Sequence, residues 1–139
     1  MSVFVIDASV TLPLIFEDES SPYADAVAES LEGNRALAPV VWPLEVANAI
    51  LTAARRGRIP DADVPFLFGA TERFRVELDQ GRDPGHLAQL ALSLGAVHRV
   101  SAYDASYLEL ALWRGVSLAT LDQRLRRAAS AAGVSLYQP

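Results

Sequence analysis

The sequence contains neither cysteine nor lysine. Without cysteine, the chain can form no disulfide, thiolate metal site or thiol nucleophile. Without lysine, both a P-loop phosphate site and Schiff-base catalysis are excluded, because each needs the lysine amine. All 12 basic residues are therefore arginine. Any metal ligands must come from carboxylates, His86 and His98.

Long apolar runs are also missing. No stretch approaches the ~20 residues of a membrane span, since Pro39 and Pro43 interrupt the longest candidate, and no basic region precedes the short apolar run at the N-terminus. We therefore expect a cytoplasmic protein with no membrane partner. The net charge of −5 disfavours general nucleic-acid binding, so a polyanion would need a local arginine patch.

Proline, glycine and polar caps divide the chain into helical segments separated by short apolar runs. The expected helices are Pro22 to Gly33, Pro43 to Gly57, Pro84 to Gly95, Ser101 to Gly115 and Asp122 to Gly133, with a less regular one from Pro60 to Phe74. The expected strands are Val3 to Ile6, Ala36 to Ala38, Phe74 to Leu78, Val116 to Ala119 and Val134 to Tyr137. This alternation predicts one α/β domain, residues 1–139, with a short parallel sheet of about five strands and helices on both faces.

Four acids occupy comparable positions in this pattern: Asp7, Glu45, Asp104 and Asp122. Each has an ordinary explanation, because acids are favoured as N-caps and in the first turn of helices. In a parallel sheet, however, strand ends and the helix starts after them meet at the carboxyl edge. Two carboxylates ~4 Å apart repel by ~4 kcal/mol at an effective dielectric constant near 20. A close cluster therefore needs raised pKa values or a bound cation.

Oxygen ligands without histidine or cysteine suit Mg²⁺ or Mn²⁺. Such a site fits metal-assisted hydrolysis of a phosphodiester, in which the metal generates the attacking hydroxide and stabilises charge on the phosphoryl oxygens.

The four acids and their neighbours give the chain a resemblance to the PIN-domain ribonucleases, especially toxins of the VapC type. The resemblance spans nearly the whole chain and rests on Val5-Ile6-Asp7-Ala8-Ser9, Glu45 with Asn48, Tyr103-Asp104-Ala105-Ser106-Tyr107-Leu108, and Thr120-Leu121-Asp122-Gln123-Arg124-Leu125. It implies a Mg²⁺- or Mn²⁺-dependent endoribonuclease with Asp7, Glu45, Asp104 and Asp122 at its catalytic site. We expect Asp7, Asp104 and Asp122 to be the metal ligands, with Glu45 as a further ligand or a base beside them. Many relatives carry another acid where Gln123 and Arg124 stand here.

The resemblance also implies two protein partners. A cognate antitoxin is expected in a hydrophobic groove formed partly by the first helices, which would leave Leu12, Leu14, Ile15 and Phe16 exposed until the partner covers them. A second copy of the chain is expected to complete a homodimer.

Several polar residues are candidates for supporting roles. Ser9 and Thr120 could orient a ligand carboxylate, or could serve only as turn or cap hydroxyls. Asn48 shares a helical face with Glu45 and could orient it or bind substrate, or could be a plain polar helix position.

Two arginine groups are candidates for RNA contact. Arg55, Arg56 and Arg58 form one, and Arg124, Arg126 and Arg127 form the other. Arginine near a helix C-terminus also has a sufficient explanation in the helix dipole.

Two other functional classes remain open from the residues alone. One is a non-catalytic protein-binding module in which the acids only cap helices. The other is a Mg²⁺-dependent phosphatase, which is disfavoured because the chain has no lysine and because Ser9 stands where an Asp-x-Asp motif needs its second acid.

Overall fold

A parallel sheet of four strands, in the order β3-β2-β1-β4, forms the centre of the computed structural model, which describes residues 1–139. The strands are β1 (Val3–Ile6), β2 (Arg35–Pro39), β3 (Glu77–Asp79) and β4 (Ser117–Ala119). In the central pairs, Val5 lies opposite Leu37 on one side and Leu118 on the other. The predicted α/β class and parallel sheet are confirmed.

The predicted number of strands, about five, is one too many. The run from Val134 to Tyr137 pairs with β4 only through a single bridge between Leu136 and Leu118. Two backbone hydrogen bonds hold it there, from Leu118 N–H to the Ser135 carbonyl and from Tyr137 N–H to the Leu118 carbonyl. These are too few to extend the ladder by a full strand.

The strand predicted from Phe74 to Leu78 begins later than expected. Phe74 ends a 3₁₀ turn, Ala70–Phe74, and Arg75 then adopts a left-handed backbone with φ of 49°. Because this conformation breaks the extended run, only Glu77–Asp79 pairs with β2.

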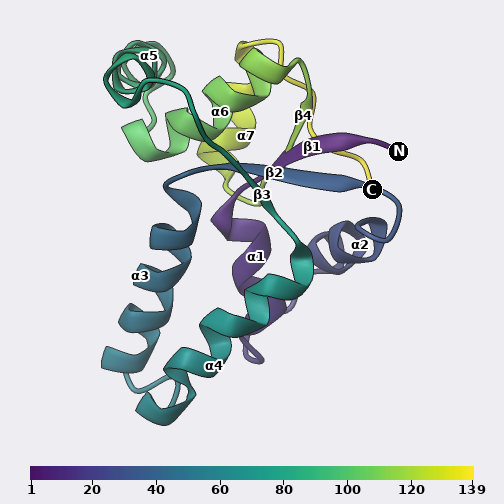
Figure 1. Ribbon diagram of the computed structural model, residues 1–139, viewed down its shortest axis with the longest axis vertical. Helices are drawn as coiled ribbons and strands as arrows, with labels where there is room; N and C mark the ends of the chain where they lie inside the picture. Colours follow the sequence, from purple (N-terminus) through teal and green to yellow (C-terminus); the bar gives the residue numbers. More distant parts are fainter.

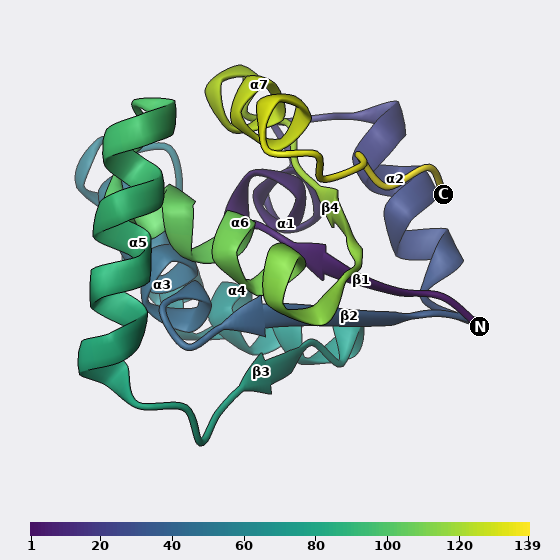
Figure 2. The ribbon, with the colours of Figure 1, turned by 90° about the horizontal axis from the view of Figure 1, so that it is seen from above.

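Helices cover both faces of the sheet (Figures 1 and 2). Helices α1 to α4 follow β1 and β2 and lie on one face, whereas α5 to α7 lie on the other, as right-handed crossovers require in this strand order. The helices are α1 (Ala8–Ile15), α2 (Pro22–Ser30), α3 (Trp42–Arg55), α4 (Val64–Gly69), α5 (Pro84–His98), α6 (Ala102–Arg114) and α7 (Gln123–Ala131), with a further 3₁₀ turn at Asp61–Asp63.

The predicted helix starts at Pro22 and Pro84 are correct, but α5 continues three residues beyond the predicted stop at Gly95. This glycine is needed for packing rather than for ending the helix. A Cβ atom at Gly95 would lie 2.9 Å from the carbonyl oxygen of Val100, in the turn that leads into α6. Gly115 does end α6, with φ of 64°.

The hydrophobic core lies on both sides of β1. Phe4, Val5 and Ile6 are fully buried, and helices from the two faces add residues such as Ile50 and Leu108. No helix combines the length and the apolar character that crossing a bilayer requires.

Candidate active site

The carboxyl edge of the sheet holds all four acids that the sequence singles out. Asp7 follows β1 directly, and its N–H donates to the carbonyl of Ala119 at the end of β4. Glu45 and Asp104 lie in the first turns of α3 and α6, and Asp122 is the N-cap of α7. The side chains come from four separate parts of the chain.

Asp7 is the most enclosed of the four, with 4% of its surface exposed. Ser9 Oγ donates to its Oδ1 at 2.5 Å, and Thr120 Oγ1 donates to its Oδ2 at 2.7 Å. Both hydroxyls also accept a backbone N–H, from Leu121 and Asp122 respectively. Ser9 and Thr120 therefore orient the Asp7 carboxylate and tie it to the segment that leads into α7.

Burial raises the pKa of Asp7 to about 6. The hydrogen bonds from Ser9 and Thr120 oppose this shift by stabilising the charged form, and the negative charges of Asp104 and Asp122 add to it. Near pH 6 and below, this carboxylate therefore takes up a proton in the absence of a cation.

Asp104 interacts electrostatically with each of the other three acids. Burial and the charge of Asp122 raise its pKa, while a hydrogen bond with Ser101 and the charge of Arg124 lower it. The charge of Asp104 in turn raises the pKa of both Asp7 and Glu45. The four acids thus form one electrostatic group centred on Asp104.

Glu45 is held by a residue for which the sequence suggested no role. Its Oε1 accepts a hydrogen bond of 2.6 Å from the hydroxyl of Tyr107, which is 1% exposed. Asn48, the partner expected for Glu45, is instead exposed. Tyr107 lies three positions after Asp104 in α6, and this spacing, which places the two on neighbouring surfaces of the helix, was the available signal.

The donor set fits a hard divalent cation, because every candidate ligand atom is a carboxylate oxygen and both histidines lie on α5. In the structure, however, no group of three or more acidic or histidine side chains is close enough together to hold a metal ion. Several carboxylate oxygens are engaged in hydrogen bonds, including both of Asp7 and Oδ1 of Asp122. The assignment of Asp7, Asp104 and Asp122 as ligands stays a prediction.

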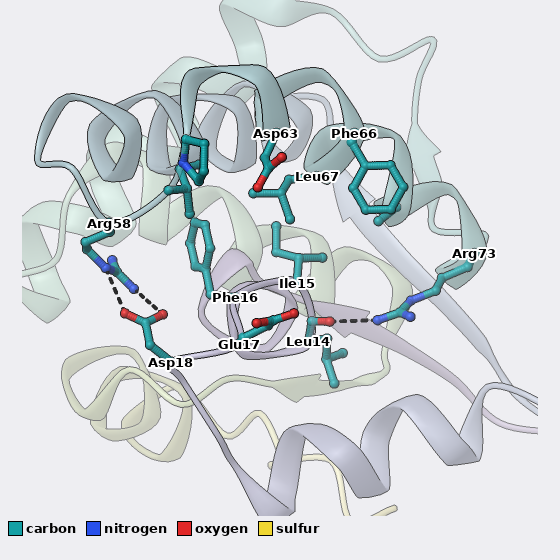
Figure 3. Close-up of a pocket in the computed structure, with 13 residues that line it drawn as sticks. Leu14, Ile15, Phe16, Glu17, Asp18, Arg58, Asp63, Phe66, Leu67 and Arg73 are labelled. Atoms are coloured by element: carbon teal, nitrogen blue, oxygen red, sulfur yellow. Dashed lines mark hydrogen bonds and ion pairs between the residues drawn. The ribbon is translucent and has the colours of Figure 1, made fainter.

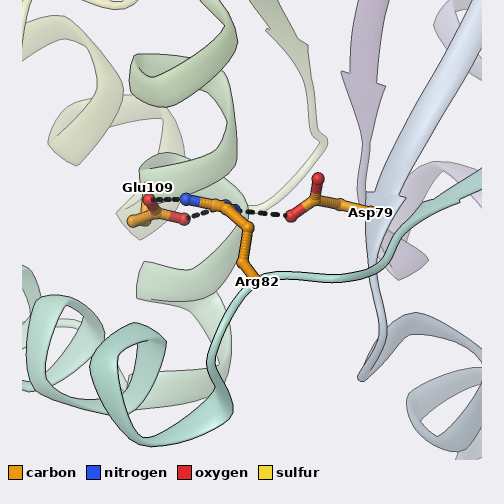
Figure 4. A network of polar contacts seen from close by, with 3 residues as sticks. All are labelled: Asp79, Arg82 and Glu109. Atoms are coloured by element: carbon orange, nitrogen blue, oxygen red, sulfur yellow. Dashed lines mark hydrogen bonds and ion pairs between the residues drawn. The ribbon is translucent and has the colours of Figure 1, made fainter.

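A fifth acid at this edge, Asp79, is committed to a separate contact (Figure 4). Arg82 donates to Asp79 at 2.9 Å and forms a two-pronged pair with Glu109 of α6 at 2.7 and 2.8 Å. Its guanidinium also lies over the ring of Trp113. Because Arg82 neutralises Asp79, this acid stands apart from the electrostatic group around Asp104.

The first of the two arginine groups predicted to contact RNA lies away from the acids. Arg55 and Arg56 are at the C-terminal end of α3, whereas Glu45 is at its beginning. Arg58 is paired with Asp18 at 2.9 Å and lies over Phe16. Arg124 of the second group is different, because its positive charge lowers the pKa of Asp104; it is exposed on the first turn of α7.

The remaining arginines of this helix differ in their surroundings. Arg126 donates its Nε–H to the Thr120 carbonyl at 2.7 Å and lies over the ring of Tyr23, whereas Arg127 is exposed.

Comparisons with known proteins identify relatives of this chain. The chain is 32% identical to ribonuclease VapC12 of Mycobacterium tuberculosis over 128 residues, which cover 88% of this chain and 89% of the relative. It is 29% identical to ribonuclease VapC3 of Pyrobaculum aerophilum over 121 residues, covering 87% and 90%. These similarities confirm the resemblance to the VapC type.

The fold has a counterpart among solved structures. The crystal structure of PAE2754 from Pyrobaculum aerophilum superposes with a TM-score of 0.66 at 20% identity, covering 91% of this chain and 84% of that one. The family profile described as PIN domain matches residues 4–131. This match includes all four acids and all but the first residue of the four strands, and the chain accordingly belongs to the PIN-domain family.

Proposed function

We propose that this chain is a divalent-metal-dependent endoribonuclease and the toxin component of a type II toxin–antitoxin system, folded as one nuclease domain over residues 1–139. The observation that supports the nuclease activity most directly is the gathering of four acids at the carboxyl edge, where burial and neighbouring negative charge together raise the pKa of Asp7, Glu45 and Asp104. The similarity to two proteins named as ribonucleases supports RNA as the substrate. A location in the cytoplasm stays a prediction.

In this proposal, Asp7, Asp104 and Asp122 hold Mg²⁺ or Mn²⁺. When bound, the cation supplies positive charge that offsets the repulsion among the acids and makes water a better nucleophile toward the phosphodiester. Ser9 and Thr120 keep the Asp7 carboxylate in position.

Two further residues act beside the ligands. Glu45 has one oxygen outside its bond with Tyr107, which can join the ligands of the cation or accept the proton of the attacking water. Arg124 lies where it can contact an RNA phosphate, because its charge already acts on Asp104.

Cleavage of structured RNA by the purified chain tests the nuclease activity. We expect cleavage with Mn²⁺ and none with EDTA, a loss of at least ~100-fold in Asp104→Asn, and no loss in Asp25→Asn, which changes an exposed acid in α2. Equal cleavage by wild type and Asp104→Asn would refute the assignment.

Thermal unfolding without RNA distinguishes the nuclease from a non-catalytic module. A cation at 100 times its Kd stabilises the folded state by ~2.7 kcal/mol, and Asp104→Asn should lose this stabilisation. A chain that gains no stability from Mn²⁺ and cleaves nothing would be the binding module instead.

A groove between the end of α1 and α4 supports a protein partner (Figure 3). It has a volume of about 570 Å³, and its lining combines apolar residues such as Ile15, Phe66 and Leu67 with three acids, Glu17, Asp18 and Asp63, and two arginines, Arg58 and Arg73. Asp18 is already paired with Arg58, which leaves Glu17 and Asp63 as the acids of the groove without an ion pair. These two acids and the apolar residues beside them fit an amphipathic segment that carries arginine or lysine, as we propose for the antitoxin.

The expectation that Ile15 and Phe16 are exposed before the antitoxin binds is wrong. Both are buried, with 7% and 4% exposed, because α2, α3 and the 3₁₀ turn after α4 pack against α1 and because Arg58 lies over Phe16. The exposed apolar residue of the groove is Phe66, at 76%.

The antitoxin is tested by co-expression with the product of a short neighbouring gene that encodes an amphipathic tail. Phe66→Ser should weaken the complex by at least tenfold, whereas Phe68→Ser, a change in the same helix outside the groove, should leave it unchanged. Equal weakening by both variants would exclude this groove as the binding surface.

Helix α5 supports the proposed homodimer. Of its 15 residues only Ala91 is buried, and the segment contains no Asp, Glu or Arg. Leu92 and Val97 are 70% and 73% exposed. A two-fold interface brings the same patch of each copy together, so an uncharged surface lets two chains of net charge −5 meet without repulsion between like charges at the contact.

A further inference from the structure

The hydroxyl of Tyr107 connects α6 to α3 at the candidate active site. Tyr107 is almost completely buried, and its hydroxyl donates to Oε1 of Glu45 at 2.6 Å. The ring belongs to the hydrophobic core, so only the oxygen atom makes a polar contact. The bond therefore has a rigid donor on one side and a half-buried carboxylate on the other.

Glu45 depends on this bond more than a surface glutamate would. Burial and the negative charge of Asp104 both act against its charged form, and the hydrogen bond from Tyr107 acts in its favour. A glutamate side chain also has several free torsions, which cost free energy to fix. Without a donor at Oε1, repulsion from Asp104 would favour conformations in which the carboxylate turns away toward solvent.

The hydroxyl groups of the other hydrogen-bonded tyrosines have neutral partners, so a bond to a carboxylate is not a general feature of tyrosines in this fold. Tyr137 is also buried, and its hydroxyl donates to Ser30 Oγ at the end of α2 and accepts from Asn34 just before β2, both neutral partners. Tyr23 donates to a backbone carbonyl. Only Tyr107 places its hydroxyl on an acid of the site.

We infer that Tyr107 is a positioning residue that holds the Glu45 carboxylate beside Asp104 and thereby raises the affinity of the acidic site for a divalent cation. This inference rests on the proposed function. In this inference Glu45 has a fixed orientation, in which Oε1 is bound to Tyr107 and Oε2 faces the cation-binding site. Loss of a residue that orients a metal ligand typically costs 10–100-fold in metal affinity or activity.

Calorimetric titration of the metal-free full chain with Mn²⁺, in the absence of RNA, tests the inference. Tyr107→Phe removes one oxygen atom and keeps the ring, so we expect about tenfold weaker Mn²⁺ binding. In RNA cleavage at a fixed Mn²⁺ concentration below saturation, kcat should fall by a similar factor while KM for RNA stays within about twofold.

A matched variant and a double-mutant cycle separate positioning from stability. Tyr137→Phe also deletes a buried hydroxyl with polar partners and should leave Mn²⁺ affinity within about twofold of wild type. In a Glu45→Gln background, Tyr107→Phe should weaken Mn²⁺ binding no further, because the carboxylate through which it acts is gone. If Tyr107→Phe does not fold, replacement of Tyr107 by 4-fluorophenylalanine fills the space of the hydroxyl and removes the donor.

The outcomes divide clearly. Wild-type affinity in the Tyr107 variant, equal weakening by Tyr137→Phe, or an undiminished effect in the Glu45→Gln background would each overturn the inference and leave the proposed nuclease intact. Absence of Mn²⁺ binding by the wild-type chain would overturn both.

Discussion

Thr120 Oγ1 donates a hydrogen bond of 2.7 Å to Oδ2 of Asp7, although 113 positions separate the two residues. Both are buried, and Thr120 is fully so. The end of β4 thus supplies a donor to the acid at the end of β1, at the edge where the two strands lie side by side.

Thr120→Val should lower the free energy of unfolding by about 2 kcal/mol at pH 8 in EDTA, because it leaves one oxygen of a buried carboxylate without a donor. Urea denaturation measures the loss. Thr71→Val is the control, since Thr71 is also buried, at 6% exposed, but donates to the neutral carbonyl of Phe68. The expected loss there is smaller, about 1 kcal/mol, and an equal loss in both variants would contradict a special role for the carboxylate.

The pKa of Asp7 predicts how stability depends on pH. Its folded-state pKa of about 6 lies above the ordinary value of 3.8, so the folded chain binds this proton more tightly than the unfolded chain. The stabilisation is therefore complete below about pH 4 and is lost as pH rises toward 6. Asp7→Asn should abolish this loss and should be more stable than wild type by up to roughly 3 kcal/mol at pH 8.

Urea denaturation of wild type and Asp7→Asn between pH 4 and 8, in EDTA, measures this difference. The two curves should diverge from pH 4 to 6 and run parallel above pH 7, whereas Asp25→Asn should follow wild type throughout. Saturating Mn²⁺ should reverse the ranking at pH 8, because the cation stabilises only the protein that binds it. A constant difference across the whole pH range would rule out the raised pKa.

Arg82→Ala should destabilise the fold by about 3 kcal/mol, because it leaves Glu109, whose side chain is 10% exposed, as an unpaired buried charge. The double variant Arg82→Met with Glu109→Gln should recover much of this loss. Arg35→Ala breaks the exposed pair with Glu77 and should have a much smaller effect. Thermal and urea unfolding measure all three, and similar losses for Arg82→Ala and Arg35→Ala would show that burial of the pair does not matter.

Leu92→Glu should shift the chain toward monomer, because it places like charges opposite each other where two copies of α5 would meet. Analytical ultracentrifugation across a range of protein concentrations measures the change, and we expect at least a tenfold rise in the dimer Kd. Phe68→Glu adds the same charge on α4 and should leave the Kd unchanged. A wild-type chain that is monomeric at high concentration would contradict the dimer itself.

Apolar periodicity, with proline and glycine at element ends, was enough to place most helices and the central strands. The rule that strand ends share one edge of a parallel sheet then placed the acids together, because it depends only on topology. The same local signals were wrong at Gly95, where they predicted the end of a helix. This position is glycine because the carbonyl oxygen of Val100 lies too close for a side chain. The local signals also failed at Arg75, where a non-glycine residue takes a left-handed conformation.

The contacts that the sequence did not predict are pairings between distant side chains. Tyr107 and Glu45 meet because α3 and α6 enter the same edge from opposite faces of the sheet. Arg58, predicted for RNA, is instead paired with Asp18 at the end of α1. In both cases the sequence shows residues that can form a hydrogen bond or an ion pair. Which of the possible partners each one contacts depends on how the helices pack.

Because the chain is synthesised from its N-terminus, the residues of the partner groove emerge before those of the acidic site. The groove between α1 and α4 is formed by residues between Leu14 and Arg73, whereas the acidic site needs Thr120 and Asp122 near the C-terminal end. A ribosome-bound chain can therefore expose the partner groove before its catalytic site is complete. In the proposed toxin–antitoxin pair, an antitoxin that binds this groove would reach the chain before it is able to cleave RNA.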